Sequence, residues 1–351
     1  MQTLLPGITA QRIPTDRLTV NILQVDGRQG IPVLLVHGNV SSSLFWQQLM
    51  LALPDRYRPI AIDLRGFGDT DPLPVDASRG VRDYSDDVIA TVRSLGLSAV
   101  HIIGWSLGGG VVLQYLLDAG SDLASVTLVN PVSPFGLAGT RGVEGVVNEP
   151  PGIGAGGGTA NPGFVALLAA GDRSSDSPLS PRNVLLSQYV KPPFVPELLD
   201  IFVESMLSTR TGDDHYPGDS IAVPQWPGMK AGSRGVVNTI APDHFRLADL
   251  SGVDPKPPIL WVRGSDDVIV SDGSLYDLAF LGSKGYVPGW PGEETCSPQP
   301  MVGQTRHVLD GYAATGGRYR EVVITDSGHS PFLEKPAEFL AALVETLDEA
   351  S

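Results

Sequence analysis

The chain has 351 residues, 42% of them hydrophobic, and a formal net charge of −15. This hydrophobic content is ordinary for a globular protein with a full core. The strong negative charge disfavours nucleic acids and anionic membranes as partners, because both repel an acidic surface.

The single cysteine, Cys296, cannot form an intrachain disulfide, so no disulfide framework is expected. It lies in a Pro/Gly-rich stretch without a visible activating partner, and we do not expect it to be a nucleophile. The N-terminal residues MQTLLPGITAQRIP lack the basic and apolar regions of a signal peptide. No run approaches the roughly 18 apolar residues of a membrane span. We therefore expect a soluble, cytoplasmic protein.

Seven short segments rich in Val, Ile and Leu are predicted to be strands. Each is bounded by Gly, Pro, Asp or Asn, and the central ones are almost continuously hydrophobic, which is typical of strands buried on both faces of a parallel sheet. The segments are 18–25, 31–38, 57–64, 100–106, 125–130, 257–264 and 319–325.

Longer amphipathic segments between these strands are predicted to be helices. They are 43–53, 83–96, 108–120 and 336–347. Alternation of strands and helices predicts an α/β fold with a doubly wound, mostly parallel sheet. The strand segments assign residues 1–130 and 253–351 to this core.

Residues 131–252, the first insertion, contain no clear strand and are rich in Gly and Pro. A connection of this length is rarely structureless in a compact domain, so we expect a lid or cap. Its apolar clusters, 164–170 and 198–207, suggest helices. Residues 271–318, the second insertion, interrupt the core again and are expected to contain one helix near 302–314.

The pentapeptide GWSLG (104–108) lies between a predicted strand and a predicted helix. In this context Gly-x-Ser-x-Gly is typical of a sharp turn that lifts the serine hydroxyl clear of a sheet. Gly104 and Gly108 have no Cβ atoms to collide across such a turn. We therefore expect Ser106 to be a nucleophile rather than part of a chance pentapeptide.

His329 follows the last predicted strand and precedes the last predicted helix. Open α/β sheets build their sites at the carboxyl ends of their strands, and a histidine there can accept a serine proton at neutral pH. The other five histidines lack this position or, for His37, are better explained as structural. We expect His329 to be the general base.

The triad acid must accept a hydrogen bond from the far ring nitrogen of the histidine. Asp266 and Asp267 both follow the predicted strand 257–264 and compete for this role. An earlier strand, where some enzymes carry the acid, ends in Asn130 and not in a carboxylate. This favours the later position.

The segment LVHGNVSSSLFW (35–46) follows a strand and opens a helix. Gly38 lets the backbone approach a bound carbonyl, and the expected oxyanion donors are the backbone N–H groups of Asn39 and Leu107. The segment DLRGFGDTD (63–71) is interpreted as architecture, a Gly-containing turn whose charged side chains brace neighbouring loops.

Five motifs together resemble the α/β-hydrolase fold family, especially its lid-bearing esterase, lactonase and carbon–carbon hydrolase branch. They are HGN (37–39), DLRGFGDT (63–70), GWSLGG (104–109), GSDDVIV (264–270) and GHSPFLEKP (328–336). The resemblance covers most of the chain except the two insertions. It implies the order Ser, Asp, His and favours Asp267 over Asp266 as the acid, but it does not specify a substrate.

These features predict a serine hydrolase that cleaves a carboxylic ester or lactone through an acyl-enzyme, without metal or organic cofactor. Trp105, Phe135 and Trp226 are candidates for the wall of a pocket that binds a medium-sized hydrophobic substrate. Three alternatives remain: a carbon–carbon hydrolase acting on a vinylogous diketone, a cofactor-free perhydrolase, and a non-enzymatic ligand receptor. The oligomeric state stays open.

Overall fold

The computed structural model describes residues 2–351 and contains one central sheet of eight strands. Their order is β1-β2-β4-β3-β5-β6-β13-β14; β1 and β2 run antiparallel to their neighbours and the remaining pairs are parallel. The strands are β1 (Ile8–Pro14), β2 (Thr19–Val25), β3 (Ile31–Val36), β4 (Tyr57–Ile62), β5 (Val100–Trp105), β6 (Leu123–Val129), β13 (Ile259–Gly264) and β14 (Tyr319–Ile324). The predicted doubly wound, mostly parallel α/β fold is confirmed.

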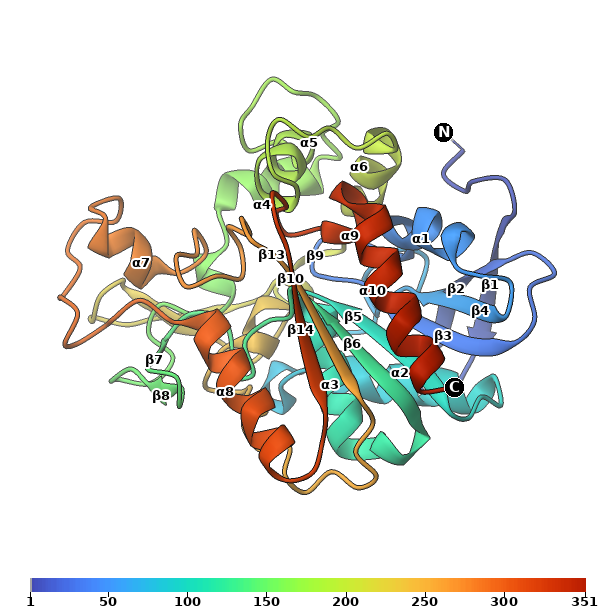
Figure 1. Cartoon of the computed structure of the whole chain (residues 1–351). Helices are drawn as coiled ribbons and strands as arrows, with labels where there is room; N and C mark the ends of the chain where they lie inside the picture. Colours follow the sequence, from blue (N-terminus) through green and yellow to red (C-terminus); the bar gives the residue numbers. More distant parts are fainter. Residues whose placement is uncertain (1) are drawn as a thin grey trace.

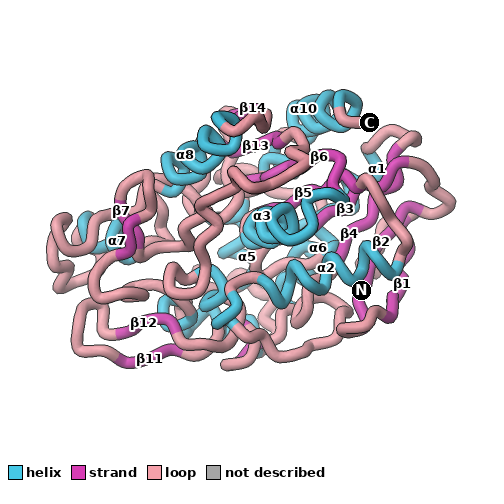
Figure 2. The backbone as a smooth tube through the Cα atoms, turned by 90° about the horizontal axis from the view of Figure 1, so that it is seen from below, coloured by secondary structure: helices cyan, strands magenta, loops and turns pink. Residues whose placement is uncertain are grey.

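Helices cover both faces of this sheet. Figure 2 shows α1 and α10 on one face and α2 and α3 on the other. Their bounds are α1 (Gln47–Ala52), α2 (Arg82–Ser94), α3 (Leu107–Ala119) and α10 (Pro336–Glu349). All six residues of β5, the strand before Ser106, are buried, as expected for a strand between two helical layers.

Three details differ from the sequence prediction. Strand β1 was missed because it is an antiparallel edge strand on which only Ile8 and Ile13 are buried, so it lacks a continuous apolar run. The helix expected at 43–53 is divided into a 3₁₀ turn and α1. The first insertion was expected to contain no clear strand, but it contains three short two-stranded ribbons.

The first insertion otherwise consists of short helices joined by long loops. The helices are α4 (Pro162–Ala169), α5 (Pro181–Val184) and α6 (Leu199–Leu207), with one π-helical turn at Leu185–Tyr189. The ribbons pair β7 (Thr140–Arg141) with β8 (Val146–Val147), β9 (Thr211–Gly212) with β10 (Tyr216–Pro217), and β11 (Ser220–Ala222) with β12 (Met229–Ala231). In Figure 1, α4, α5 and α6 lie beyond the ends of the parallel strands from which the Ser106 and His329 loops emerge. Helices expected at the two apolar clusters are confirmed as α4 and α6.

The second insertion contains the helix expected near 302–314 and one short helix that was not expected. They are α8 (Met301–Ala314) and α7 (Leu278–Ser283). The short α9 (Pro331–Glu334) then follows β14 and leads into α10.

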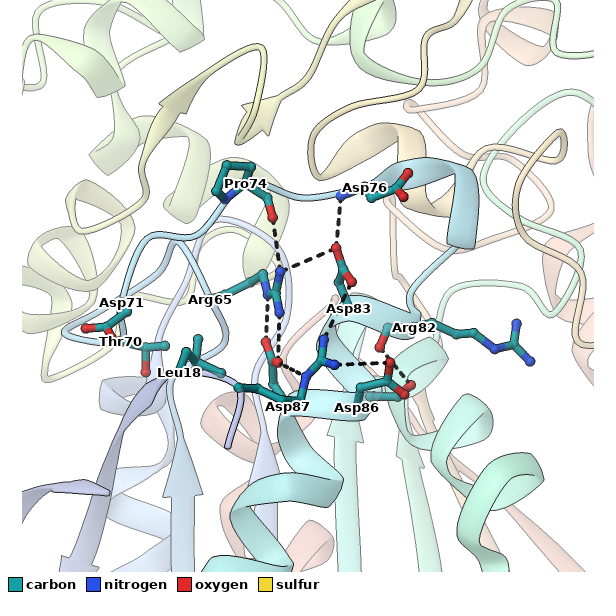
Figure 3. Close-up of polar contacts among 12 residues, drawn as sticks. Leu18, Arg65, Thr70, Asp71, Pro74, Asp76, Arg82, Asp83, Asp86 and Asp87 are labelled. Atoms are coloured by element: carbon teal, nitrogen blue, oxygen red, sulfur yellow. Dashed lines mark hydrogen bonds and ion pairs between the residues drawn. The ribbon is translucent and has the colours of Figure 1, made fainter. Parts of the chain in front are cut away.

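The turn at 63–71 braces neighbouring loops, as expected from its charged residues. The buried guanidinium of Arg65 donates two hydrogen bonds to Asp87, at 2.6 and 2.8 Å, and one to the carbonyl of Pro74 at 3.0 Å. Figure 3 shows these contacts together with Asp83, whose carboxylate lies 3.4 Å from Arg65. These contacts join the turn after β4 to the first half of α2.

Replacing Arg65 by methionine is expected to lower the free energy of unfolding by about 3–5 kcal/mol, because it leaves buried carboxylates undercompensated. The matched control is Arg79→Met, which removes a 41% exposed arginine from the same carboxylate cluster and is expected to cost less than about 1 kcal/mol. Urea denaturation of both variants measures the difference. Equal losses would contradict the structural role assigned to Arg65.

Candidate active site

Ser106 sits on a sharp turn between β5 and α3. Its backbone angles, φ 57° and ψ −119°, are strained for a residue with a side chain, and its N–H donates to the carbonyl of Val129 at 2.9 Å. A Cβ at Gly104 would lie 2.3 Å from the carbonyl oxygen of Gly108, and one at Gly108 would lie 2.5 Å from that of His37. Both glycines are therefore required by close backbone contacts, and the half-buried Ser106 is presented at the carboxyl end of the sheet.

His329 lies in the loop after β14 and is buried. Its Nδ1 is 2.8 Å from Oδ2 of Asp267, while Nε2 has no hydrogen-bond partner within residues 2–351. A carboxylate beside Nδ1 favours the tautomer with the proton there and leaves Nε2 free to accept one. No hydrogen bond joins Ser106 and His329 in the described chain, although both line the same cavity. Such contacts often tighten only when substrate is bound.

The two competing aspartates have different surroundings. Asp267 is buried, and its second oxygen accepts hydrogen bonds from the N–H groups of Ile269 and Val270, at 2.7 and 3.2 Å. Asp266 is exposed, and its contacts are with the Ser265 hydroxyl and, at 3.0 Å, the ammonium of Lys191. Hydrogen bonds from these two groups lower the pKa of Asp266. Only Asp267 contacts the imidazole.

Asn130 holds the two loops of this pair together, a role that the sequence did not reveal. Its amide nitrogen donates to the carbonyl of His329 at 2.8 Å, and its oxygen accepts from the N–H of Gly264 at 3.0 Å. The indole N–H of Trp105 donates to the same His329 carbonyl at 2.8 Å. A carboxylate at 130 would lack the donor that the His329 carbonyl uses.

The expected oxyanion donors border the same cavity. Leu107 is the first residue of α3, where backbone N–H groups have no intrahelical acceptor. Neither its N–H nor that of Asn39 donates to an acceptor within residues 2–351. A Cβ at Gly38 would lie 3.0 Å from the Cβ of Ser106, so glycine permits this close approach. The side-chain oxygen of Asn39 accepts from the N–H of Val40 at 2.9 Å.

The cavity around Ser106 is small and mainly apolar, with a volume of about 50 Å³. It is lined by residues from the core and from both insertions. They are Asn39, Ser106, Leu107, Val132, Leu137, Tyr189, Ile240, Ile269, Val270, Tyr276 and His329. None of these side chains is a lysine or an arginine.

The three residues proposed from sequence for the pocket wall do not line this cavity. Trp105 is fully buried and packs against Trp46 and Phe332. Phe135 is buried beneath the guanidinium of Arg246. Trp226 lies beside a separate cavity of about 230 Å³, which Cys296 also borders.

The wall instead includes two tyrosines, Tyr189 and Tyr276, that sequence analysis did not single out. They lie in the two insertions, where no repeating hydrophobic pattern indicates which side chains face inward. Cys296 lies outside the Ser106 cavity, and burial raises the pKa of its thiol to about 11. A thiol with such a pKa is a poor nucleophile at neutral pH.

Within residues 2–351, no group of three or more His, Cys, Asp or Glu side chains is arranged to hold a metal ion. In the same range, no helix has the length and hydropathy needed to cross a membrane.

The sequence model of a protein family described as "Alpha/beta hydrolase family" matches residues 33–343. This range includes the turn at Ser106 and the His329–Asp267 pair. The chain belongs to the alpha/beta hydrolase family. This membership agrees with the sheet order and with the position of the site at the carboxyl ends of the strands.

Local similarity connects this alpha/beta hydrolase to several curated proteins. It is 32% identical over 139 residues to the non-heme chloroperoxidase CPO-A1 of Kitasatospora aureofaciens, which is 39% of this chain and 50% of that protein. It is 32% identical over 99 residues to the 2-(acetamidomethylene)succinate hydrolase of Mesorhizobium japonicum, which is 28% of this chain and 34% of that protein. The chain spans half or less of the length of the curated relatives it matches.

Among solved structures, the esterase RhEst1 from Rhodococcus sp. ECU1013 is similar along the whole chain. The TM-score is 0.60 at 21% sequence identity, and the match covers 98% of this chain and 100% of that one. At this identity the likeness shows the fold alone.

Proposed function

We propose that this alpha/beta hydrolase is a serine esterase that works through an acyl-enzyme. The observation that carries the proposal is the buried His329–Asp267 pair beside a cavity that also contains Ser106 and two free backbone N–H groups. These are the parts that acyl transfer requires: a nucleophile, an oriented base and donors for an oxyanion.

In the proposed mechanism, the Ser106 hydroxyl attacks the ester carbonyl and its proton passes to Nε2 of His329. Asp267 stabilises the imidazolium, and the N–H groups of Asn39 and Leu107 donate to the oxyanion. The imidazolium then protonates the leaving alcohol. Water, deprotonated by His329, attacks the acyl-enzyme, and the imidazolium returns this proton to the Ser106 oxygen as the acid leaves.

The cavity supports a neutral substrate with a short acyl group. Typical ligand pockets have volumes of about 300–1,000 Å³, whereas this cavity has about 50 Å³. A medium-sized hydrophobic ester or lactone therefore fits only if its larger part extends outside the cavity or if the first insertion moves as a lid. The aliphatic lining suits an apolar acyl group.

Labelling with a fluorophosphonate, followed by mass spectrometry, tests the nucleophile. We expect a single adduct, on Ser106, because it lines the same cavity as the imidazole held by Asp267. Ser41 and Ser125, which contact His37 and His101, are fully buried. A panel of p-nitrophenyl esters tests the substrate, and we expect acetate and butyrate to have a higher kcat/KM than octanoate. Labelling without turnover would favour the ligand receptor, and an adduct elsewhere would contradict the proposal.

A cofactor-free perhydrolase is a second candidate. It is favoured by the small cavity, which suits a short carboxylic acid, and by the local similarity to a chloroperoxidase. Such an enzyme converts the acid and hydrogen peroxide to a peracid and water through the same acyl-enzyme. Halide oxidation that depends on both acetate and peroxide, measured beside ester hydrolysis, distinguishes the two activities.

No observation in the site favours the carbon–carbon hydrolase. The motif GHSPFLEKP (328–336) supports the fold: Phe332 stacks on Trp46 with ring centroids 4.4 Å apart, and the carboxylate of Glu334 accepts from the N–H of Gly328 at 2.9 Å. The cavity lining also offers no cationic side chain to the carboxylate of a dienoate substrate.

A further inference from the structure

Two hydrogen bonds to the carbonyl at the other side of the same peptide fix the direction of the Asn39 N–H. This N–H belongs to the peptide whose carbonyl is that of Gly38, which accepts from His37 Nδ1 at 2.7 Å and from the Ser41 hydroxyl at 2.9 Å. His37 Nε2 accepts from the N–H of Leu64 at 3.0 Å, so Nδ1 carries the ring proton. Since N–H and C=O point in opposite directions across a trans peptide, holding the carbonyl orients the N–H.

The next peptide is held from the first insertion. The carbonyl of Asn39 accepts a hydrogen bond from the hydroxyl of Tyr189 at 2.9 Å. The following residue, Val40, has φ 45°, which is unfavourable for a β-branched side chain and needs support from its surroundings. Burial raises the pKa of Tyr189 well above its usual value, so its hydroxyl remains a donor at neutral and alkaline pH.

Tyr189 is itself packed against the proposed catalytic groups. Its ring meets those of Trp105 and His329 edge-on, with centroids 5.7 and 6.1 Å away. Two residues further on, the N–H of Lys191 donates to Glu334 at 2.8 Å, and Glu334 also binds the His329 loop at Gly328. The same short segment therefore contacts the loop of Asn39 and the loop of His329.

The ammonium of Lys191 adds contacts outside the cavity. It lies 2.8 Å from Asp326, on the His329 loop, and 3.0 Å from Asp266, beside Asp267. These ion pairs are partly exposed and individually weak, but they join the same segment to the loops that carry the proposed base and acid.

We propose that Tyr189 is a positioning residue, which completes the oxyanion-binding site while the first insertion is docked. It fixes the Asn39–Val40 peptide, which directly follows the peptide that carries the donor N–H of Asn39. The inference rests on the proposed esterase function and assigns to the insertion a part in orienting the transition-state donor. Undocking of residues 185–191 removes the restraint on Asn39 and Val40. The proposal therefore expects a lower kcat whenever this segment moves away from the core.

The variant Tyr189→Phe tests this, because it keeps the ring and its packing but removes the hydroxyl. We expect kcat for p-nitrophenyl acetate to fall roughly 10-fold with little change in KM, less than the 10²–10³-fold of losing a donor outright. Affinity for a trifluoromethyl ketone, which forms an anionic tetrahedral adduct on serine, should fall by a similar factor. The matched control is Tyr276→Phe, whose lost hydroxyl binds Gln188 on the same segment but not the Asn39 loop. Its kcat should fall at most a few-fold, because the segment is only loosened, and its main effect should appear in KM.

An unchanged kcat in folded Tyr189→Phe, or the same loss of kcat in both tyrosine variants, would overturn the inference while leaving the esterase proposal intact. Absence of Ser106-dependent turnover in the wild type would overturn both. If Tyr189→Phe does not fold, Lys191→Met loosens the segment from outside the cavity and should lower kcat a few-fold. An unchanged kcat in Lys191→Met would then refute the positioning role.

Discussion

Replacing Ser106 by alanine is expected to lower kcat for p-nitrophenyl acetate by up to about 10⁶-fold, the scale seen when a triad nucleophile is removed from a serine hydrolase. Without the hydroxyl there is no acyl-enzyme, and the imidazole of His329 has no proton to accept from the protein. Stopped assays over many hours, with highly purified protein, are needed to measure such a loss.

The same variant should keep its fold, because Ser106 is half-buried and its hydroxyl makes no hydrogen bond within residues 2–351. Thermal unfolding therefore serves as the control, with the midpoint expected close to that of the wild type. Fluorophosphonate labelling should disappear together with turnover. Activity within tenfold of the wild type, in a variant with unchanged melting, would exclude Ser106 as the nucleophile.

The core could be predicted from sequence because strands buried between two helical layers are hydrophobic along almost their whole length. Strands such as β3 and β5 are almost continuously apolar in sequence. The Gly-x-Ser-x-Gly motif also predicts the sharp turn, because only glycine at 104 and 108 avoids a backbone clash there. Strand β1 has no such hydrophobic run, since only two of its side chains are buried.

The wall of the site could not be predicted in the same way. Tyr189 reaches the Asn39 loop across 150 residues of sequence, and no local pattern encodes such a contact. Trp105 misled the prediction because it stands next to the nucleophile. It is the last residue of β5, and its ring packs against Phe332 without bordering the cavity.

The aspartate pair offers the sharpest test of the site, because the chain contains its own control one residue away. Asp267→Asn is expected to reduce kcat by about 10⁴-fold, since an amide beside Nδ1 neither holds the productive tautomer nor stabilises the imidazolium. KM should change little, because Asp267 does not line the cavity.

Asp266→Asn should change kcat less than tenfold. This carboxylate is exposed, contacts Lys191 and Ser265, and shares the Lys191 ammonium with Asp326. The two substitutions make the same chemical change in the same loop, so a difference of three orders of magnitude between them would arise from contact with His329 and not from altered loop charge. A larger loss in Asp266→Asn would reverse the assignment, and equal small losses would mean that neither carboxylate orients the base.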